Sequence, residues 1–385
     1  MTERTRVAVL GSTGSIGRQA LDVLATHPDR FEVVALAAGR DEARLNEQVA
    51  RFKPALTALA KDGPGALDDI ASSDEVDLIL VGTTGVVSLR PVLAALQCGK
   101  VVATANKETL VAGGHLVMPL ARRLAVDAGH EDEAAGALTW LRPIDSEHSA
   151  IWQCLAGERR QDVIRVILTA SGGPFREWSA DRLQSATPAD ALAHPTWRMG
   201  AKITIDSASL MNKALEIIEA RWLYDLGDDQ VDVVVHPQSV IHSLVEFADG
   251  SLKAQLGLPD MRIPIQYALT YPAHLPSPAP RLTGSAFPSL TFEPVDETRF
   301  PALAIGRDGG RRGPRASAAL IAADDIAVER FLAGSLNFPG IAALCGEAVE
   351  RYGTGDPPAL EELLQLDAEV RAWAATATPS GASVS

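Results

Sequence analysis

Three acidic side chains, distant in the sequence, are candidates for holding one cation. Asp145 and Glu147 stand two residues apart, and Glu216 lies in a later segment. Residues two apart in an extended segment point the same way, so Asp145 and Glu147 would converge. Carboxylates that face one point repel unless a cation lies between them, and three carboxylates without cysteine suit Mg²⁺ or Mn²⁺. The alternative is a polar turn entering a helix, with Asp145 or Ser146 as its cap.

A hydroxyl, an amide, an ammonium and a carboxylate occur together in residues 207–219. Ser207 would cap the following helix, where free N–H groups and the helix dipole favour an anion. Asn212 and Glu216 would share one face of that helix, with Lys213 beside them, opposite a broad apolar stripe. Such a helix could hold a phosphate at one end and a cation at the other. The alternative is a solvated polar face behind a serine cap.

Two further segments have the composition of ligand-binding loops. Ser171 lies in Thr-Ala-Ser-Gly-Gly-Pro, a strand end followed by a turn that offers a hydroxyl and amides to a phosphate. The segment His194–Gly200 combines proline and glycine with Trp197 and Met199, which favours a lid that closes over a substrate. The alternative is an ordinary loop with Trp197 packed into the core.

Residues 11–17, Gly-Ser-Thr-Gly-Ser-Ile-Gly, indicate a dinucleotide site because they follow the first expected strand and open a helix. A tight turn without a ligand is the alternative. Arg40 follows the second strand, where an enzyme specific for NAD would carry an acid, so the pattern favours NADP despite Asp41 next to it. Asn-Lys-Glu at 106–108 follows a later strand and would lie near the nicotinamide.

These residues must be positioned by an α/β chain of several domains. We expect an N-terminal Rossmann-like doubly wound sheet, an α+β catalytic domain and a C-terminal helical domain. Apolar runs predict first-domain strands at 7–10, 31–37, 76–81 and 100–104, and second-domain strands at 163–169, 203–205, 231–235 and 240–247. The predicted divisions are an NADPH-binding domain 1–144, a catalytic domain 145–271, a Pro-rich linker 272–301, a helical domain 302–374 with a flexible Gly/Arg loop at 306–315, and a disordered tail 375–385.

Bulk composition excludes several classes of protein. The chain has 385 residues and a formal net charge of −14, which opposes nucleic-acid binding. No apolar run reaches the length of a membrane span. The first residues pass directly into an expected strand, so we expect no signal peptide. Cys98, Cys154 and Cys345 are widely separated, as expected in a reducing cytosol without disulfides or zinc.

The motifs together resemble one family closely. Residues 11–17, Ala-Asn-Lys-Glu, Pro-Ile-Asp-Ser-Glu-His, Thr-Ala-Ser-Gly-Gly-Pro-Phe, His-Pro-Thr-Trp-Arg-Met-Gly and Asp-Ser-Ala-Ser-Leu-Met-Asn-Lys occur in unbroken order between residues 7 and 272. This order resembles the 1-deoxy-D-xylulose 5-phosphate reductoisomerase family of the non-mevalonate isoprenoid pathway. The likeness weakens in the last domain, where the family's usual Asn-Ala-Ala-Asn-Glu appears as Ile-Ala-Ala-Asp-Asp at 321–325.

The resemblance implies a role for each matched residue. Those expected to contact NADPH are Thr13, Gly14, Ser15, Ile16, Gly39, Arg40, Asp41, Asn106, Glu108 and Gly200. Those expected to hold Mg²⁺ or Mn²⁺ are Asp145, Glu147 and Glu216. The substrate phosphate would bind Ser171, Ser207, Asn212 and Lys213, and the sugar would contact Lys107, Ser146, Glu147, Glu216 and His194 under a flap with Trp197 and Met199. Lys107 and the three metal-binding carboxylates form the expected catalytic set.

The implied reaction is the rearrangement and NADPH-dependent reduction of a phosphorylated ketose, 1-deoxy-D-xylulose 5-phosphate, to 2-C-methyl-D-erythritol 4-phosphate. The family is a cytoplasmic homodimer, so the resemblance implies the same state here. Two alternatives remain open at this point. One is another NADPH-dependent dehydrogenase of a small phosphorylated or semialdehyde substrate, and the other is a non-catalytic module that senses NADPH.

Overall fold

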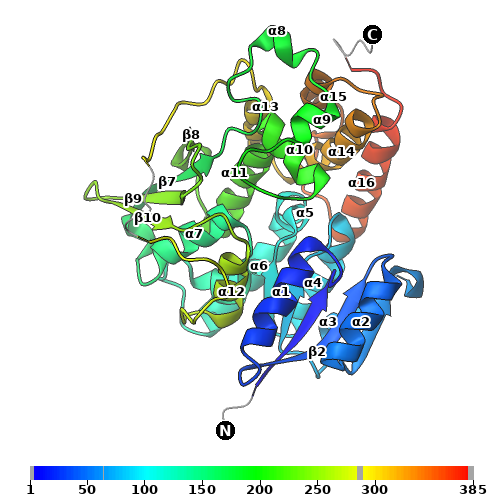
Figure 1. Ribbon diagram of the computed structural model, residues 1–385, viewed down its shortest axis with the longest axis vertical. Helices are drawn as coiled ribbons and strands as arrows, with labels where there is room; N and C mark the ends of the chain where they lie inside the picture. Colours follow the sequence, from blue (N-terminus) through cyan, green and yellow to red (C-terminus); the bar gives the residue numbers. More distant parts are fainter. Residues whose placement is uncertain (1–3, 64, 284–288, 380–385) are drawn as a thin grey trace. The chain divides into compact units, whose positions relative to one another are not determined.

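The computed structural model describes residues 4–63, 65–283 and 289–379, and the chain divides into two compact units (Figure 1). Unit 1 comprises Met1–Thr109, Leu116–Asp162 and Asp260–Ser285. Unit 2 comprises Leu110–His115, Val163–Pro259 and Ala286–Ser385. Within the described ranges no helix is both long enough and apolar enough to cross a membrane.

Unit 1 is built on a six-stranded parallel sheet with the order β3-β2-β1-β4-β5-β6. The strands are β1 (Thr5–Leu10), β2 (Phe31–Ala38), β3 (Leu56–Leu59), β4 (Leu78–Val81), β5 (Val101–Thr104) and β6 (Leu141–Pro143). The strand order reverses between β1 and β4, where doubly wound sheets bind their ligands. The predicted Rossmann-like sheet is therefore confirmed. Two of its strands, β3 and β6, were not predicted, because β3 is mostly not buried and β6 contains Arg142 and Pro143, so neither gives a clear apolar run.

Helices cover this sheet because each has one apolar face. In α1 the buried positions include Ala20, Leu21 and Leu24, spaced three and four residues apart as a helix requires. The helices of this part of the chain are α1 (Ser15–Thr26), α2 (Glu42–Phe52), α3 (Gly65–Ser72), α4 (Leu89–Gln97), α5 (Lys107–Val111), α6 (Gly114–Asp127), α7 (Ser146–Leu155) and α12 (Arg262–Thr270).

The expectation that residues 145–147 are extended is wrong. Helix α7 begins at Ser146, and Asp145 is its N-cap. The Asp145 carboxylate accepts hydrogen bonds from the backbone N–H groups of Glu147 and His148. The first turn of a helix has free N–H groups that a side-chain oxygen can satisfy, whereas an isolated extended segment offers no such arrangement. Residues 145–147 therefore form the turn that enters a helix.

Unit 2 contains a four-stranded mixed sheet with the order β10-β9-β7-β8. Its strands are β7 (Val163–Ala170), β8 (Val231–Val235), β9 (Ile241–Phe247) and β10 (Leu252–Leu256). Three of them were predicted. The edge strand β10 was missed because it alternates Lys253 and Gln255 with exposed leucines and so lacks a buried apolar run.

The strand expected at 203–205 is a helix. Helix α10 (Ala201–Ser209) includes these residues, and α11 (Met211–Tyr224) follows after the single residue Leu210. Two isoleucines separated by one residue imitate strand alternation. The helix forms because Lys202 and Asp206 pair one turn apart and Thr204 bonds the Gly200 carbonyl. Ser207 therefore lies inside α10 and is not the expected N-cap.

Leu210 has a φ of 62°, a left-handed conformation, and it serves as both the C-cap of α10 and the N-cap of α11. The chain changes direction there without a loop. Two short helices precede this pair, α8 (Ala180–Leu183) and α9 (Pro188–Leu192).

The C-terminal part is helical, as predicted. It comprises α13 (Ala302–Arg312), α14 (Pro314–Leu332), α15 (Phe338–Tyr352) and α16 (Leu360–Ala374). The prediction of a flexible loop at 306–315 is wrong, because most of these residues lie in α13. A Cβ on Gly306 would lie 2.4 Å from the Ala214 Cβ, so its glycine allows α13 to pack closely on α11.

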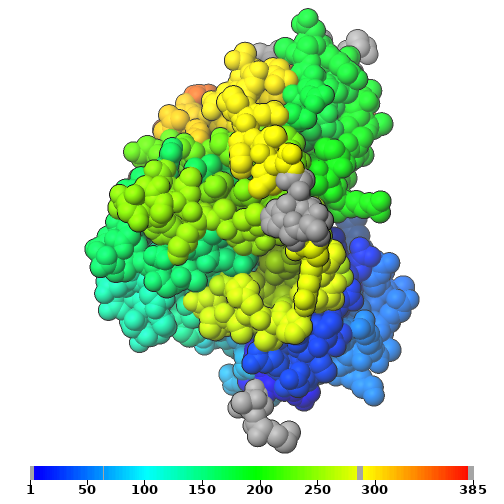
Figure 2. Space-filling model, turned by 60° about the vertical axis from the view of Figure 1, so that its left-hand side comes forward, coloured from blue at the N-terminus to red at the C-terminus, as the bar shows by residue number. Residues whose placement is uncertain are grey.

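The Pro-rich segment 272–301 has no regular helix or strand in its described residues, and Figure 2 shows that segment (yellow) on the surface. One isolated bridge joins Glu293 to Val235. The predicted disordered tail 375–385 lies partly outside the described residues, since description ends at residue 379.

Candidate functional site

The glycine-rich turn of unit 1 forms because two backbones approach too closely for a side chain. A Cβ on Gly11, whose φ is +82°, would lie 2.7 Å from the Gly82 backbone, and one on Gly17 would lie 2.3 Å from the Gly11 oxygen. The N-cap of α1 is Gly14, which supplies no side-chain acceptor to the first helical turn. The N–H groups of that turn are therefore free to face an anion, as dinucleotide-binding turns require.

The loop after β2 carries a cation, Arg40, at the sheet edge where the glycine-rich turn lies. Arg40 is exposed, and its guanidinium has no ion-pair or hydrogen-bond partner among the described residues. Asp41 is the N-cap of α2, and its carboxylate accepts from the Arg44 N–H at 3.1 Å. Because the Asp41 carboxylate caps its own helix, the Arg40 guanidinium keeps its donors for a ligand.

The Asn106 side chain connects the loop after β4 to the loop after β5 by hydrogen bonds, at the carboxyl edge of the sheet. Its side-chain amide donates to the carbonyls of Thr83 and Gly85, both at 3.0 Å, and its carbonyl oxygen accepts from the Thr109 N–H. Asn106 and Glu108 are both buried. The structure thus gives Asn106 a bracing role, and its expected contact with NADPH stays a prediction.

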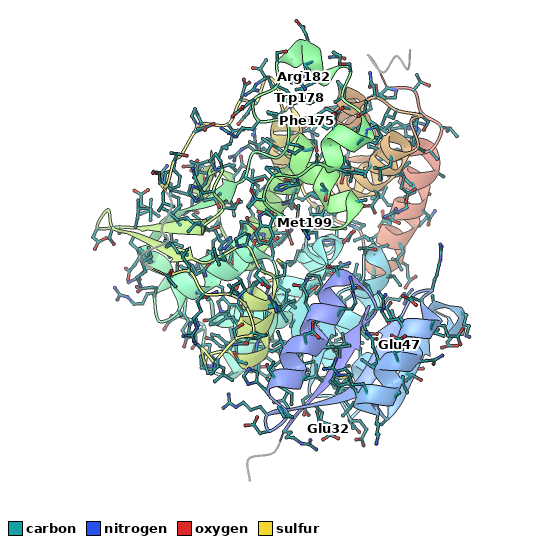
Figure 3. All side chains as sticks on the ribbon, in the orientation of Figure 1. Glu32, Glu47, Phe175, Trp178, Arg182 and Met199 are labelled. Atoms are coloured by element: carbon teal, nitrogen blue, oxygen red, sulfur yellow. The ribbon has the colours of Figure 1, made fainter. Side chains whose placement is uncertain are left out.

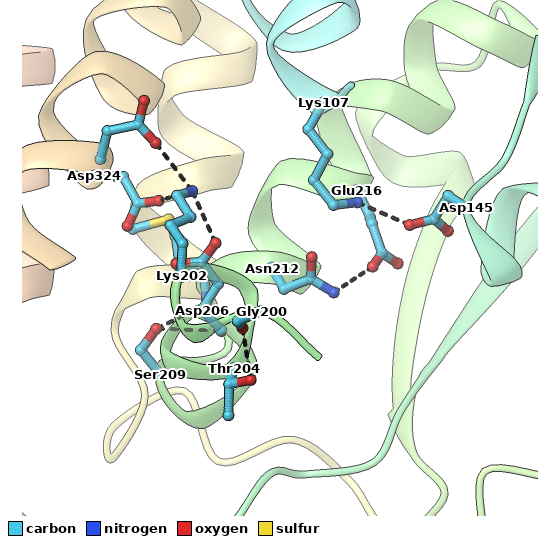
Figure 4. Close-up of polar contacts among 12 residues, drawn as sticks. Lys107, Asp145, Gly200, Lys202, Thr204, Asp206, Ser209, Asn212, Glu216 and Asp324 are labelled. Atoms are coloured by element: carbon cyan, nitrogen blue, oxygen red, sulfur yellow. Dashed lines mark hydrogen bonds and ion pairs between the residues drawn. The ribbon is translucent and has the colours of Figure 1, made fainter. Parts of the chain in front are cut away.

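Lys107 and Asp145 form an ion pair in unit 1, with 2.9 Å between Nζ and Oδ2 (Figure 4). The two side chains retain only 12% and 16% of their exposure, so water screens the pair weakly. Beside them the Ser146 hydroxyl donates to Glu147 Oε2 at 2.6 Å. Four of the predicted residues therefore lie together at the start of α7.

Ser171, His194 and Ser207 form one hydrogen-bonded cluster in unit 2. His194 Nε2 lies 3.0 Å from the Ser171 hydroxyl and 3.2 Å from the Ser207 hydroxyl. Its Nδ1 accepts from the backbone N–H groups of Thr196 and Trp197. An acceptor Nδ1 places the ring proton on Nε2. Burial lowers the pKa of His194, which also favours this neutral donor form.

A glycine makes this cluster possible. A Cβ on Gly173 would lie 2.7 Å from the Ser207 carbonyl oxygen, and its φ is +64°. The Ser171 turn can therefore lie directly against α10. The following residues are anchored by Phe175, whose ring centroid is 4.5 Å from that of Trp178, and by Arg182, 3.6 Å above Trp178 (Figure 3).

Asn212, Lys213 and Glu216 meet on α11. The Asn212 amide donates to the Glu216 carboxylate at 2.5 Å (Figure 4). The Lys213 ammonium donates to the same carboxylate, also at 2.5 Å. The Glu216 side chain is fully buried and that of Lys213 is 4% exposed. The alternative of a solvated polar face is therefore wrong, because the Lys213 and Glu216 side chains are buried and Glu216 accepts from both Asn212 and Lys213.

The expected flap, His194–Gly200, contains no regular helix or strand. Trp197 and Met199 are half-buried, and Gly200 is the N-cap of α10. The Trp197 ring centroid lies 6.1 Å from that of His242. The role of this segment as a closing lid stays a prediction.

Sequence reasoning missed a second group of carboxylates, formed by Asp206 and Asp324 around Lys202. The spacing of four residues between Lys202 and Asp206 would have indicated their ion pair had 201–209 been recognised as a helix. Asp324 lies in a distant helix, and no local pattern pointed to it.

Comparison with known proteins gives matches along most of the chain. Family models of 1-deoxy-D-xylulose 5-phosphate reductoisomerase match residues 7–64 and 57–114, and models of the C-terminal domains of this family match residues 141–224 and 256–373. The chain is 47% identical over 381 residues to the reductoisomerase of Pelotomaculum thermopropionicum, covering 94% of this chain and 95% of that protein. With the Heliobacterium modesticaldum protein it shares 45% identity over 401 residues and 99% of each chain.

Comparison with solved structures gives the same family. A reductoisomerase in complex with NADPH, fosmidomycin and magnesium superimposes with a TM-score of 0.87 at 35% identity, covering 96% of this chain and 97% of the other. The Zymomonas mobilis enzyme in complex with NADPH gives a TM-score of 0.84 at 37% identity, covering 97% and 98%.

Proposed function

This chain belongs to the 1-deoxy-D-xylulose 5-phosphate reductoisomerase family, and from that premise we propose which of its residues carry out the family's reaction. The enzyme is an NADPH- and divalent-metal-dependent oxidoreductase that converts 1-deoxy-D-xylulose 5-phosphate to 2-C-methyl-D-erythritol 4-phosphate. The comparisons support neither a different dehydrogenase nor a non-catalytic sensor.

Asp145, Glu147 and Glu216 bind the divalent ion in our proposal. Their donor atoms are all carboxylate oxygens, which suit the hard ions Mg²⁺ and Mn²⁺ and not zinc. Asp145 and Glu147, which are neighbours at the start of α7, would supply two of these carboxylates, and Glu216 of α11 would supply the third. When bound, the ion would polarise the substrate carbonyl as a Lewis acid, and NADPH would supply the hydride.

Lys107 is the fourth catalytic residue of the proposal. Its ammonium is largely shielded from water and already lies 2.9 Å from an Asp145 oxygen. A fixed positive charge in such a place stabilises negative charge that develops on the substrate oxygens during rearrangement. Ser146, Glu147 and Glu216 would complete the contacts to the sugar.

The substrate phosphate would bind Ser171, Ser207, Asn212 and Lys213, and His194 would donate from Nε2 to the sugar. This proposal is supported by the cluster of two hydroxyls around that donor nitrogen. The phosphate takes no part in the chemistry. Its binding energy would orient the reacting carbons and favour closure of the flap that carries Trp197 and Met199.

NADPH would bind the glycine turn through Thr13, Gly14, Ser15 and Ile16. Gly39, Arg40 and Asp41 would surround the ribose that carries the 2′-phosphate, and Asn106, Glu108 and Gly200 would make the remaining contacts. The unpaired Arg40 guanidinium supports this assignment, because a planar cation binds a phosphate by two parallel hydrogen bonds.

The proposal also covers the setting of the enzyme. We keep the division into an NADPH-binding domain 1–144, a catalytic domain 145–271 and a helical domain 302–374, and we infer a cytoplasmic homodimer. The three free cysteines agree with a reducing compartment. Light scattering of the purified protein would measure the dimer directly, and a monomeric mass would contradict it.

Replacing Glu216 by glutamine tests the metal assignment. We expect wild-type protein to oxidise NADPH in the presence of 1-deoxy-D-xylulose 5-phosphate and Mg²⁺, and Glu216→Gln to lose both rate and Mg²⁺ affinity because an amide is a poor ligand for a hard cation. The measurement follows NADPH absorbance over a titration of Mg²⁺. Unaltered activity and Mg²⁺ dependence in the variant would refute the assignment.

Replacing Arg40 by aspartate tests the 2′-phosphate contact. We expect the KM for NADPH to rise by about tenfold or more, since a charge-assisted hydrogen bond is lost and a repulsive charge is introduced, while the KM for NADH does not rise. Arg51→Asp, at another exposed arginine, is the matched control. Equal losses with both cofactors would show that Arg40 does not recognise the 2′-phosphate.

A further inference from the structure

A buried charge cluster joins α10 to the C-terminal helices. Lys202 Nζ lies 2.8 Å from Asp206 Oδ2 on its own helix and 2.6 Å from Asp324 Oδ2 on α14 (Figure 4). It also lies 3.4 Å from Asp325 Oδ1. The side chains of Asp206 and Asp324 are 2% and 0% exposed, so both carboxyl groups are enclosed by protein.

The cluster extends to α16 and contains more acids than bases. Arg371 forms ion pairs with Asp325 and with Asp367, the latter at 2.8 Å. With Lys202 and Arg371 as its cations, the cluster has four carboxyl groups for two positive charges. The thiol of Cys345 on α15 faces the same carboxyl groups, and burial raises its pKa. Full ionisation would give the cluster a net charge of −2 while Asp206 and Asp324 are enclosed by protein, which is unfavourable.

Geometry shows where a proton would reside. Asp206 Oδ1 and Asp324 Oδ1 are both buried and have no hydrogen-bond partner among the described residues, whereas their Oδ2 atoms face Lys202. The two carboxyl groups are close enough for one to donate a hydrogen bond to the other if it is protonated. Burial and the neighbouring carboxyl group raise the pKa of Asp206, and burial raises that of Asp324.

The position of α10 gives the cluster a functional consequence. This helix begins immediately after the expected flap and carries Ser207 one residue beyond Asp206. Ser207 in turn lies 3.2 Å from His194 Nε2 and supports the Ser171 turn at Gly173. A shift of α10 would therefore move the hydroxyl cluster proposed to bind the substrate phosphate.

We propose that Lys202, Asp206 and Asp324 are positioning residues for phosphate binding, in which a proton shared by the two carboxyl groups fixes α10 on α14, and loss of that proton loosens the phosphate site. The proposal rests on the proposed role of Ser207. None of the three side chains touches the substrate.

The test measures the KM for 1-deoxy-D-xylulose 5-phosphate against pH, with NADPH and Mg²⁺ saturating. Above about pH 7 the phosphate of the substrate has a constant charge, so changes there report the protein. We expect the wild-type KM to rise at alkaline pH by about fivefold, the factor expected from losing one ordinary hydrogen bond, with a smaller change in kcat. In Asp324→Asn the KM should stay near the low wild-type value throughout, because an amide keeps the hydrogen bond and cannot ionise.

Asp324→Ala is the matched variant without a hydrogen-bonding group. Its KM for the phosphorylated substrate should be raised at every pH, while its KM for NADPH stays close to that of the wild type. A merely structural role would change both KM values and kcat in both variants. The infrared band of a protonated carboxyl group should be present in the wild type and absent from Asp324→Asn, and circular dichroism checks that each variant folds.

The inference is overturned if Asp324→Asn retains the alkaline rise in KM, or if the wild type shows neither that rise nor the infrared band. Ser207→Ala separates this result from the proposed function. If its KM for the substrate equals that of the wild type, the phosphate role of Ser207 fails, and the inference fails with it. If its KM rises while Asp324→Asn behaves as the wild type, only the inference fails.

Discussion

Two regions of the molecule place a lysine among carboxylates, and they differ in how many donors each carboxylate receives. Asp145 accepts hydrogen bonds from two backbone N–H groups of α7 and forms an ion pair with Lys107. Asp206 and Asp324 share the single ammonium of Lys202, and each retains one oxygen without a partner among the described residues.

The difference shows how one residue type can serve opposite purposes. Donors stabilise the ionised form of a carboxyl group, and burial without donors stabilises the protonated form. The carboxylate at the start of α7 is therefore suited to attract a cation. The carboxyl pair under α10 is suited to retain a proton and fix two helices, so acidic residues alone do not identify a metal site.

The same substitution at both regions should give the largest contrast. We expect Asp145→Asn to lower kcat by more than about 100-fold. Loss of an outer-shell partner of a metal ligand already costs up to about 100-fold, and Asp145 is proposed as a ligand itself. Asp206→Asn should leave kcat close to the wild-type value, because its amide can still hydrogen-bond Asp324 and neither group is proposed to bind the metal. Steady-state kinetics over a range of Mg²⁺ concentrations measures both, and comparable losses of kcat would break the comparison.

Removing the two ammonium groups should separate catalysis from stability. Lys107→Met should lower kcat by about 100-fold, since a fixed charge near the reacting oxygens is lost, with little change in Tm. Lys202→Met should lower Tm by several degrees, because two buried carboxyl groups lose their shared cation. Kinetics and thermal unfolding of both variants would show this, and a loss of Tm in Lys107→Met without loss of rate would contradict it.

The smallest effect expected is a change in how stability depends on pH. The pKa of Asp324 is raised in the folded state, so the stability that its protonated form contributes is present at acid pH and is lost as pH rises from near 3.8 through the folded pKa. The amide in Asp324→Asn does not ionise, so this variant keeps its contribution to stability as pH rises. We expect the Tm of the variant to match the wild type at about pH 4 and to exceed it by a margin that widens as pH rises, reaching a few degrees at about pH 8.

Thermal unfolding of wild type and Asp324→Asn across that pH range makes the measurement, with Asp308→Asn at an exposed carboxylate as the control. A constant difference in Tm at all pH values would show that Asp324 does not titrate differently in the folded and unfolded states.

Much of the fold follows from local sequence. The buried strands of unit 1 are short apolar runs, and the glycines at 11–17 are explained by close backbone approach, so both were predictable. Failures arose where a local pattern was ambiguous. Ile203 and Ile205 alternate as in a strand, but the pairing of Lys202 with Asp206 belongs to a helix. The glycines of residues 306–315 suggested flexibility, whereas Gly306 permits tight packing on Ala214.

The candidate site was predictable in its residue types and less so in its conformations. Asp145, Ser171 and Ser207 were selected because their chemistry suits metal or phosphate binding. The helix cap at Asp145 and the buried setting of Glu216 depend on packing and could not be inferred from spacing alone. Asp324 was not selected at all, because its partners are more than a hundred residues away in the chain.

The junction at Leu210 has a consequence for how such chains can vary in length. Because α10 passes into α11 through one left-handed residue, an insertion or deletion there would rotate α11 by about 100° and carry Asn212 and Lys213 away from Ser207. We therefore expect related sequences to keep an invariant residue count between Ser207 and Lys213, and to place their gains and losses of residues in irregular surface stretches such as the described parts of 272–301.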